Sequence, residues 1–403
     1  MLPPLLFLAH RLPYPPNKGD KIRSFHLLKC LANHYRVFLG AFVDAPEDMQ
    51  LVGALREFCE GLRVLRLRPG WAKLASLEGL LQGEALTVPY YRRRELADWV
   101  DRTIVERDIR RALVFSSGMA SYLLGARHSG LRRVIDFVDV DSDKWAQYAG
   151  TTSVATRWIY RREAVQLLAL ERRIAKEFDG SVFVSAAEAE LFRKLAPESV
   201  DKVSFAYNGV DTVYFDPDLS LPSPYAKGEC PLVFTGAMDY WPNVDAVCWF
   251  AEQILPVVRR SLPGAVFYAV GARPAPAVQR LARIPGVRVT GQVADVRPYL
   301  RHAATVVAPL RIARGIQNKV LEGMAMAKPT VVTPAALEGI AAVPGEEVLL
   351  ASDADRFADC VVSAVSARAA AAFGVNARRR VLTDFDWDRN LEGFHDLLEG
   401  GGT

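Results

Sequence analysis

Short runs of apolar, β-forming residues alternate with amphipathic stretches along almost the whole chain. This alternation is typical of parallel sheets covered by helices, since each parallel connection needs a crossover segment. We therefore predict an α/β protein with doubly wound parallel sheets. The predicted strands span residues 4–9, 35–42, 63–67, 112–116, 134–138, 181–184 and 202–207 in the first half and 232–235, 265–270, 287–290, 305–308, 330–333 and 348–350 in the second.

The alternation lapses in DTVYFDPDLSLPSPYAKGEC (Asp211–Cys230), which is rich in Pro, Ser and Asp and is typical of a linker. A chain of 403 residues is long enough for two cores. We predict an N-terminal domain over 1–212 and a C-terminal domain over 213–383. Ligands of such sheets bind beyond the carboxyl ends of the strands, so residues that directly follow strands are the candidates for a site.

Composition argues against several functional classes. No apolar run reaches the ~18 residues of a membrane-spanning helix, and the opening MLPPLLFLAH lacks the basic leader of a signal peptide. The five cysteines are scattered without a C-x-x-C pair, so we expect no disulfide framework, no zinc site and a cytoplasmic location. A net charge of +4 is too small to indicate nucleic-acid binding. We find no P-loop, G-x-G-x-x-G or G-x-S-x-G motif, so kinases, dehydrogenases and serine hydrolases lose support.

Basic residues are concentrated in the first half, where runs such as Arg92-Arg93-Arg94 recur. One interpretation is that these side chains cover solvated helix faces. The other is attraction to an anionic membrane surface or to an acidic acceptor. The sequence leaves both open.

The first strand leads into PYPPNKGDKIR, a turn that opens a helix. Gly19 lets a ligand approach the backbone, and the amides at the helix start, with Lys18 and Lys21 nearby, suit an anion. We take Gly19, Asp20, Lys18 and Arg23 as candidate site residues. An ordinary turn between strand and helix is an equally good explanation of this stretch.

The run VIDFVDVDSDKW places three acids at alternate positions where a strand ends. A calcium loop would need Gly at its sixth position and an acid at its twelfth, but Lys144 and Gly150 stand there. A D-x-D pair that holds a divalent metal on a diphosphate stays open. We favour hydrogen bonds from Asp139 and Asp141 to sugar or acceptor hydroxyls, with Lys144 as a further contact and no metal.

Two further loops follow predicted strands. Asn208 and Gly209 come after the last strand of the first half, and Thr235-Gly236-Ala237-Met238 comes after the first strand of the second. Glycine permits positive φ or close backbone approach, as a phosphate-facing loop needs, although simple turn chemistry explains Asn-Gly as well. We predict ligand contacts at Gly236, Met238 and Asn208.

The most informative stretch is LRIARGIQNKVLEGMAMAKP. A helix that starts at Gln317 and Asn318 presents free amides and a dipole that attract phosphate. Lys319, with Arg311 as a second candidate, can neutralise a diphosphate. One turn later Glu322 can accept hydrogen bonds from two neighbouring hydroxyls, as on a ribose.

Five motifs carry a resemblance to a known family: PPNKGDKIRSFHLLKCLA, VDVDSDKW, FTGAMDYWPNVDAVCWF, GQVADVRPYL and LRIARGIQNKVLEGMAMAKP. Together they resemble GT-B glycosyltransferases of family 4, and most closely the sugar transferases associated with exosortase (XrtA/PEP-CTERM) exopolysaccharide systems. The resemblance covers most of the chain.

The resemblance implies two Rossmann-like domains that face each other across a cleft, with a final helix, here over 384–403, that crosses back to the first. It implies a UDP- or GDP-linked sugar as donor on the C-terminal domain, with contacts at Gly236 and Met238, and a glycan or lipid-linked acceptor on the N-terminal domain. On this resemblance Gly19 and Asp20 are catalytic candidates, and the expected contacts to the sugar or acceptor are Lys18, Arg23 and Asn208. It also implies transfer with retention, without a required cofactor or metal, by a cytoplasmic protein that contacts the inner face of the plasma membrane.

The sequence departs from the family pattern at two positions. Many members carry two glutamates eight residues apart, but Arg314 stands where the first is expected before Glu322, and Ala327 replaces a common Gly. We therefore expect Asp139 or Asp141 to take over a sugar contact. Two alternatives are a non-hydrolysing nucleotide-sugar epimerase, for which no acid/base set is evident, and a binding-only protein, for which loss of Lys319 or Glu322 would be expected.

Overall fold

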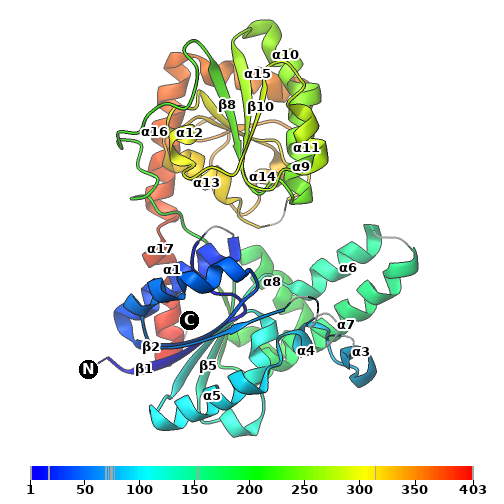
Figure 1. Cartoon of the computed structure of the whole chain (residues 1–403), viewed down its shortest axis with the longest axis vertical. Coiled ribbons are helices and arrows are strands. Elements are labelled where there is room, and N and C mark those ends of the chain that lie inside the picture. The colour runs from blue at the N-terminus through cyan, green and yellow to red at the C-terminus, as the bar shows by residue number, and fades with distance from the viewer. Residues whose placement is uncertain are drawn as a thin grey trace. The chain divides into compact units, whose positions relative to one another are not determined.

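The computed structural model describes residues 2–16, 19–68, 70, 72, 76, 78–151, 154–313 and 315–401. The chain divides into two compact units, each with its own sheet (Figure 1). Unit 1 comprises Met1–Tyr207 and Asp388–Thr403, and unit 2 comprises Asn208–Trp387. Both sheets are entirely parallel, which confirms the predicted α/β fold with two Rossmann-like sheets.

The sheet of unit 1 has the order β3-β2-β1-β4-β5-β6-β7, and all seven predicted strands are found. β3 begins at Cys59 rather than at residue 63, and its Gly61 pairs with Phe38 of β2 and leaves room for the Phe38 ring. The strands are β1 (Pro4–Ala9), β2 (Arg36–Val43), β3 (Cys59–Arg66), β4 (Arg111–Phe115), β5 (Arg132–Val138), β6 (Gly180–Phe183) and β7 (Val203–Phe205).

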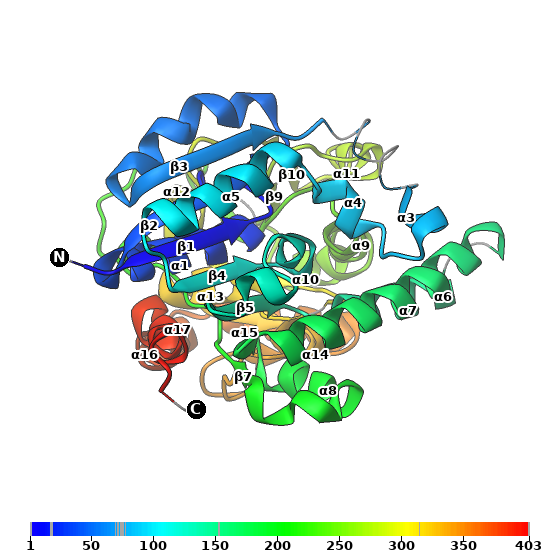
Figure 2. The same ribbon diagram turned by 90° about the horizontal axis from the view of Figure 1, so that it is seen from below.

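Helices cover both faces of this sheet (Figures 1 and 2). On one face α5, α7 and α8 bury residues such as Val100, Ile174 and Phe192 in a single apolar cluster. On the other face α17 places Leu397 against Gly180. The helical segments are α1 (Gly19–His34), η1 (Pro46–Glu57), α3 (Glu78–Gln82), α4 (Thr87–Tyr91), α5 (Arg94–Glu106), η2 (Ser117–Tyr122), η3 (Ala126–His128), α6 (Asp141–Thr151), α7 (Val154–Glu177), α8 (Ala186–Leu195), η4 (Pro197–Lys202) and α17 (Trp387–Glu399).

A buried ion pair joins α1 to the sheet of unit 1. The guanidinium of Arg23 contacts both carboxylate oxygens of Asp136 on β5, at 2.7 and 3.2 Å, and donates to the carbonyl of Ala206 at 2.8 Å. Arg23 is 1% exposed and Asp136 is fully buried. Burial raises the pKa of Asp136, and Arg23 opposes this shift. The pair fixes the start of α1 relative to the end of β5.

The start of α8 carries the S-x-x-E pattern of a capping box, from Ser185 to Glu188. The hydroxyl of Ser185 accepts from the backbone N–H of Glu188 at 3.2 Å, as this motif requires. The carboxylate of Glu188, however, accepts from the backbone N–H of Val140 at 2.7 Å. Glu188 thus ties α8 to the loop between Asp139 and Asp141, a long-range contact that a local sequence pattern does not reveal.

The sheet of unit 2 has the order β10-β9-β8-β11-β12-β13, and all six predicted strands are found. Residues 208–229, before the first strand, contain no helix or strand. The strands are β8 (Cys230–Thr235), β9 (Ala265–Val270), β10 (Val287–Gly291), β11 (Thr305–Ala308), β12 (Thr330–Val332) and β13 (Leu349–Leu350).

Within unit 2, α10 and α15 pack together on one face of the sheet, and α13 lies against β11 and β12 with α16 packed on it (Figure 1). The helical segments are α9 (Trp241–Trp249), η5 (Phe250–Ile254), α10 (Leu255–Ser261), α11 (Pro276–Leu281), α12 (Arg297–Arg301), α13 (Asn318–Ala325), α14 (Pro334–Leu337), α15 (Ala354–Val365) and α16 (Ala367–Asp384).

The turn after α13 explains one of the two sequence departures. Ala327 has φ +51°, in the left-handed region that favours glycine. Its carbonyl oxygen would lie only 2.2 Å from a Cβ on Gly374 of α16, so the helix passes very close to this turn. The conformation expected of a glycine is therefore kept by an alanine.

No helix in the described part of the chain combines the length and the apolar character needed to cross a membrane.

We expect Asp136→Ala to lower the free energy of unfolding by about 3–5 kcal/mol, because it leaves Arg23 buried without its counter-charge. Urea unfolding followed by circular dichroism measures the loss. The matched control is Glu60→Ala, which breaks an exposed pair with Arg36 and should change stability by about 1 kcal/mol or less. Equal effects of the two substitutions would contradict a structural role for the buried pair.

Candidate functional site

Two glycine loops pack against each other at the carboxyl edge of the sheet of unit 2. Gly236 follows β8 and Gly271 follows β9, both with φ +156°. A Cβ on Gly271 would lie 1.7 Å from the carbonyl oxygen of Gly236, and a Cβ on Gly236 would lie 2.7 Å from Nδ2 of Asn243. No side chain fits at either position. The Gly236 loop therefore presents bare backbone, with Cε of Lys319 3.5 Å from where its Cβ would be.

Helix α13 brings a cation and an acid to this loop. Gln317 is the N-cap residue, although its side chain makes no capping hydrogen bond, and Lys319 and Glu322 follow on the first two turns. The ammonium of Lys319 lies 3.3 Å from Oε1 of Gln317 and 5.2 Å from the centroid of the Phe234 ring. Neither neighbour carries a negative charge. Lys319 and Glu322 are both only partly exposed.

The environment of this pair shifts both side chains toward their neutral forms. Burial lowers the pKa of Lys319 to about 8, although the charge of Glu322 opposes the shift. Burial raises the pKa of Glu322 to about 7, against the opposing effects of Lys319 and of the Thr235 hydroxyl. Each group thus lacks full compensation for its charge, as is common where a charged ligand binds.

The remaining donor candidates fall into two groups. Asn318 lies in the first turn of α13 with its Oδ1 buried and without a hydrogen-bond partner among the described residues, and the amide of Gln317 donates to the carbonyl of Gly315 at 3.0 Å. Met238 is different, because its side chain is fully buried and its backbone N–H and carbonyl bond to Ala272 and Ala275. Its side chain therefore shapes the loop and cannot reach a donor.

Arg311 is held away from the role predicted for it. Its guanidinium forms a two-pronged contact with Asp245 of α9, with Nε 2.9 Å from Oδ2, and lies over the ring of Trp249. The sequence prediction missed this partner because Asp245 lies on a different helix. In this structure Lys319 is the cation at the start of α13, while Arg314 lies outside the described residues.

A second cluster at this edge was not predicted from the sequence. The guanidinium of Arg297 binds Asp295 and lies 3.9 Å from the ring centroid of Tyr214, whose hydroxyl donates to Asp295 at 3.4 Å. Glu322 is among the charges that raise the pKa of Tyr214, so the cluster adjoins the acid of α13. The sequence signal was the motif GQVADVRPYL, which contains Asp295 and Arg297 and is one of the five motifs that carry the family resemblance.

In unit 1, Asp20 lies among basic groups at the carboxyl edge of the sheet. Its Oδ2 is 2.7 Å from Nη1 of Arg11 and 3.3 Å from Nε2 of His10, the residue that follows β1. Burial tends to raise the pKa of Asp20, but the contacts with His10 and Arg11 prevail and hold it well below its usual range. A Cβ on the neighbouring Gly19 would meet no atom within 4 Å, so the backbone there is open to approach.

The acids after β5 surround a lysine. Nζ of Lys144 lies 2.5 Å from Oδ2 of Asp139 and 3.6 Å from Oδ1 of Asp141. Burial lowers the pKa of Lys144, but the two acids outweigh it and raise the pKa above its ordinary value. The pKa of Asp141 is raised by burial, and His10 is among the charges that oppose this shift, so His10 lies near this loop. Over the described ranges, no three His, Cys, Asp or Glu side chains are grouped to hold a metal ion.

Three predicted contacts of unit 1 and its boundary remain. Arg23 was expected to contact a sugar or acceptor, and in the structure its guanidinium is buried and bound by Asp136 and the carbonyl of Ala206. Lys18 lies outside the described residues. Asn208 is partly exposed and is the first residue of unit 2. Its contact with a sugar or acceptor stays a prediction.

Comparison with known proteins supports this description of unit 2. Residues 229–367 match the family model described as glycosyl transferases group 1. The matched segment contains both glycine loops and α13. The protein is a glycosyltransferase, and its similarity to this group is over residues 229–367. No curated protein sequence matches the chain.

Solved structures of similar fold extend the comparison to both units. HepE of Anabaena in complex with UDP is 15% identical, with a TM-score of 0.68 over 98% of this chain and 100% of that one. Sucrose-phosphate synthase of Thermosynechococcus elongatus is 16% identical, with a TM-score of 0.69 over 98% of each chain. WaaG, a glycosyltransferase involved in lipopolysaccharide biosynthesis, is 15% identical, with a TM-score of 0.67 over 98% of this chain and 100% of that one. These similarities confirm the GT-B fold expected from the sequence.

We expect the carboxyl of Glu322 to titrate near pH 7, and Lys319→Met to raise its pKa further by removing a positive neighbour. NMR of protein with ¹³C-labelled glutamate measures the titration, with Glu322→Gln to assign the signal. Because the folded carboxyl keeps its proton to higher pH than the unfolded one, its contribution to stability falls between about pH 4.5 and about pH 7. Titration near pH 4.5 would contradict the burial of this acid.

Proposed function

We propose that the protein transfers a sugar from a nucleoside-diphosphate sugar to a glycan or lipid-linked acceptor, with retention at the anomeric carbon. The observation that carries the proposal is the incompletely compensated Lys319 and Glu322 pair at the start of α13, beside the bare backbone of Gly236. The pair lies within the segment that matches the glycosyltransferase domain.

A nucleoside diphosphate complements each part of this arrangement. Its phosphates bring negative charge to the ammonium of Lys319, and they meet the amides of the first turn of α13. The ionised carboxylate of Glu322 accepts two hydrogen bonds from the ribose hydroxyls, which favours its charged form. Solved structures of HepE contain UDP and UDP-glucose, which supports a uridine nucleotide as the first donor to test.

The chemistry proposed for transfer needs no protein nucleophile. The bond between the anomeric carbon and the diphosphate oxygen breaks, and the acceptor oxygen bonds to the same face of the sugar. The acceptor proton passes to the departing phosphate oxygen, whose charge Lys319 and the helix amides stabilise. Support for retention, and for transfer without a required metal, comes from the resemblance to family 4.

The biological setting is a finer part of the proposal. The five long motifs resemble sugar transferases of exosortase-associated exopolysaccharide systems, which supports a role in exopolysaccharide synthesis at the cytoplasmic face of the plasma membrane. In this scheme unit 2 binds the donor and unit 1 the acceptor. The basic character of unit 1 supports contact with an acidic acceptor or an anionic membrane surface.

The donor site is tested by UDP binding measured by calorimetry. We expect Lys319→Met and Glu322→Gln each to weaken binding about tenfold or more, because each removes a charged hydrogen-bond partner. Lys227→Met and Glu252→Gln, at exposed positions of the same unit, are the matched controls and should leave the Kd unchanged. An unchanged Kd in both site variants would overturn the donor site.

The reaction class is tested by NMR of a UDP-sugar incubated with the protein, with and without a glycan acceptor. Transfer predicts a glycoside with the anomeric configuration of the donor, formed only when acceptor is present. An inverted product would contradict retention, and an epimerised nucleotide sugar without acceptor would identify an epimerase.

The role of the acids after β5 is tested separately. We expect Asp139→Asn and Asp141→Asn each to lower kcat/KM, because we propose that one of them binds the sugar in place of the acid that Arg314 replaces. Asp143→Asn, which removes the third acid of the same run, is the control and should have a smaller effect. Unchanged activity of both Asp139→Asn and Asp141→Asn would remove this role from the loop.

A further inference from the structure

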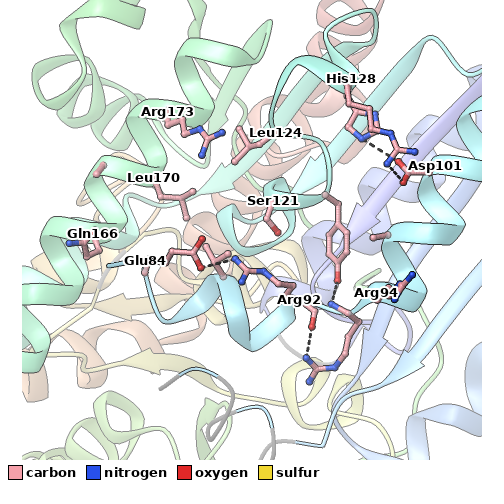
Figure 3. Close-up of a pocket in the computed structure, with 17 residues that line it drawn as sticks. Glu84, Arg92, Arg94, Asp101, Ser121, Leu124, His128, Gln166, Leu170 and Arg173 are labelled. Carbon is pink, nitrogen blue, oxygen red and sulfur yellow. Dashed lines mark hydrogen bonds and ion pairs between the residues drawn. The ribbon is translucent and has the colours of Figure 1, made fainter. Parts of the chain in front are cut away.

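A hollow of about 910 Å³ in unit 1 lies outside the residues assigned so far. Figure 3 shows side chains that reach it from three directions: Gln166, Leu170 and Arg173 from α7, Arg94 and Asp101 from α5, and Glu84 and Arg92 from the segments that flank α4. Segments far apart in the sequence therefore build one surface.

Part of the lining is apolar. Val88 belongs to a small buried cluster with Ala85 and Leu167, and Leu170 packs against this cluster. Leu124, after η2, adds a further apolar side chain to the hollow. This surface offers nothing to a freely soluble ion, but it suits a hydrocarbon chain.

The polar part of the lining is strongly basic. The lining contains two acids, Glu84 and Asp101, and more basic residues than acids. The basic lining residues are Arg92, Arg93, Arg94, Arg127, His128 and Arg173. Five of these are arginines, whose planar guanidinium groups match the oxygens of a phosphate.

The arginines are accessible to a ligand. The side chain of Arg94 is 94% exposed, and its nearest acid is Asp98 at 3.8 Å. Arg92 contacts Glu84 at 2.6 Å in a pair with both partners well exposed. Such exposed pairs contribute little to stability, so a phosphate that brings more charge can replace the carboxylate.

The hollow adjoins the carboxyl edge of the sheet that carries Asp20. The hydroxyl of Tyr122, in its lining, donates to the carbonyl of Tyr91 at 2.5 Å and accepts from the backbone N–H of Arg93 at 2.9 Å. The ring of Tyr91 in turn meets His10 edge-on, with 5.9 Å between ring centroids, and His10 contacts Asp20. Contacts through Tyr91 and His10 therefore link the lining of the hollow to Asp20.

We propose that this hollow binds an amphiphilic phosphate, with the phosphate among the arginines and the first part of its hydrocarbon chain on Val88, Leu124 and Leu170. The two kinds of lining select this class, because an inorganic phosphate leaves the apolar part unused and a neutral lipid leaves the arginines unused. The view that this molecule anchors the acceptor rests on the proposed function, whereas the binding itself does not.

The test uses the full chain and decyl phosphate below its micelle concentration, with binding measured by calorimetry. We expect the Arg92→Gln/Arg94→Gln variant to bind at least about tenfold more weakly, because it removes two charge-assisted hydrogen-bond donors. Arg110→Gln, an exposed arginine of the same unit outside the hollow, is the matched control and should bind as the unchanged protein does. Decanol, without the phosphate, and inorganic phosphate, without the chain, should both bind more weakly than decyl phosphate.

A second variant tests the apolar part. Leu170→Ala should weaken binding of decyl phosphate but leave that of inorganic phosphate unchanged. Equal affinity of the Arg92→Gln/Arg94→Gln variant and the unchanged protein would overturn the site, and equal affinity for inorganic and decyl phosphate would overturn the amphiphile as its ligand.

Binding of UDP separates this proposal from the proposed function. Arg92→Gln/Arg94→Gln should bind UDP as the unchanged protein does, because the proposed donor residues belong to unit 2. Loss of decyl phosphate binding with UDP binding intact supports the hollow. Failure of the unchanged protein to bind UDP would count against the donor proposal and leave the decyl phosphate result valid.

Discussion

The buried contact between Arg23 and Asp136 determines how the candidate edge of unit 1 is built. α1 begins with Gly19 and Asp20, and β5 leads into Asp139, so the ion pair holds the two groups of candidates in fixed positions. Such a pair is stabilising only while both charges are present and hydrogen-bonded. Arg23, which we expected to contact a ligand, thus holds the neighbouring candidate residues in position.

In unit 2 the corresponding constraint is the close approach of backbone at Gly236 and Gly271. It brings bare peptide groups next to Lys319, whose ammonium contacts the side-chain amide of Gln317 and lies near the ring of Phe234. The fold thus contains two ionisable groups, Lys319 and Glu322, and burial lowers the pKa of the first and raises the pKa of the second. Groups of this kind are tolerated where a ligand completes their interactions, and they represent stability given up for binding.

The strands and the start of α13 could be predicted because their signals are local. Each strand is a short apolar run, and Gln317, Lys319 and Glu322 lie within two turns of one helix. Contacts between distant segments could not be predicted. Three features depend on residues that come together only when the chain folds. They are the ion pair of Arg311 with Asp245, the cluster around Tyr214 and the arginine-lined hollow.

Unit 2 is one uninterrupted segment of the chain, and its two ends touch. The backbone N–H of Val210 donates to the carbonyl of Phe385 at 2.9 Å, and Gly209 packs against Trp387 so closely that a Cβ there would lie 2.8 Å from its backbone nitrogen. In evolutionary terms this is the geometry of an insertion: a whole domain can enter or leave a gene between the codons for two neighbouring surface points. A short peptide that joins residue 207 to residue 388 would accordingly give unit 1 a continuous chain of its own.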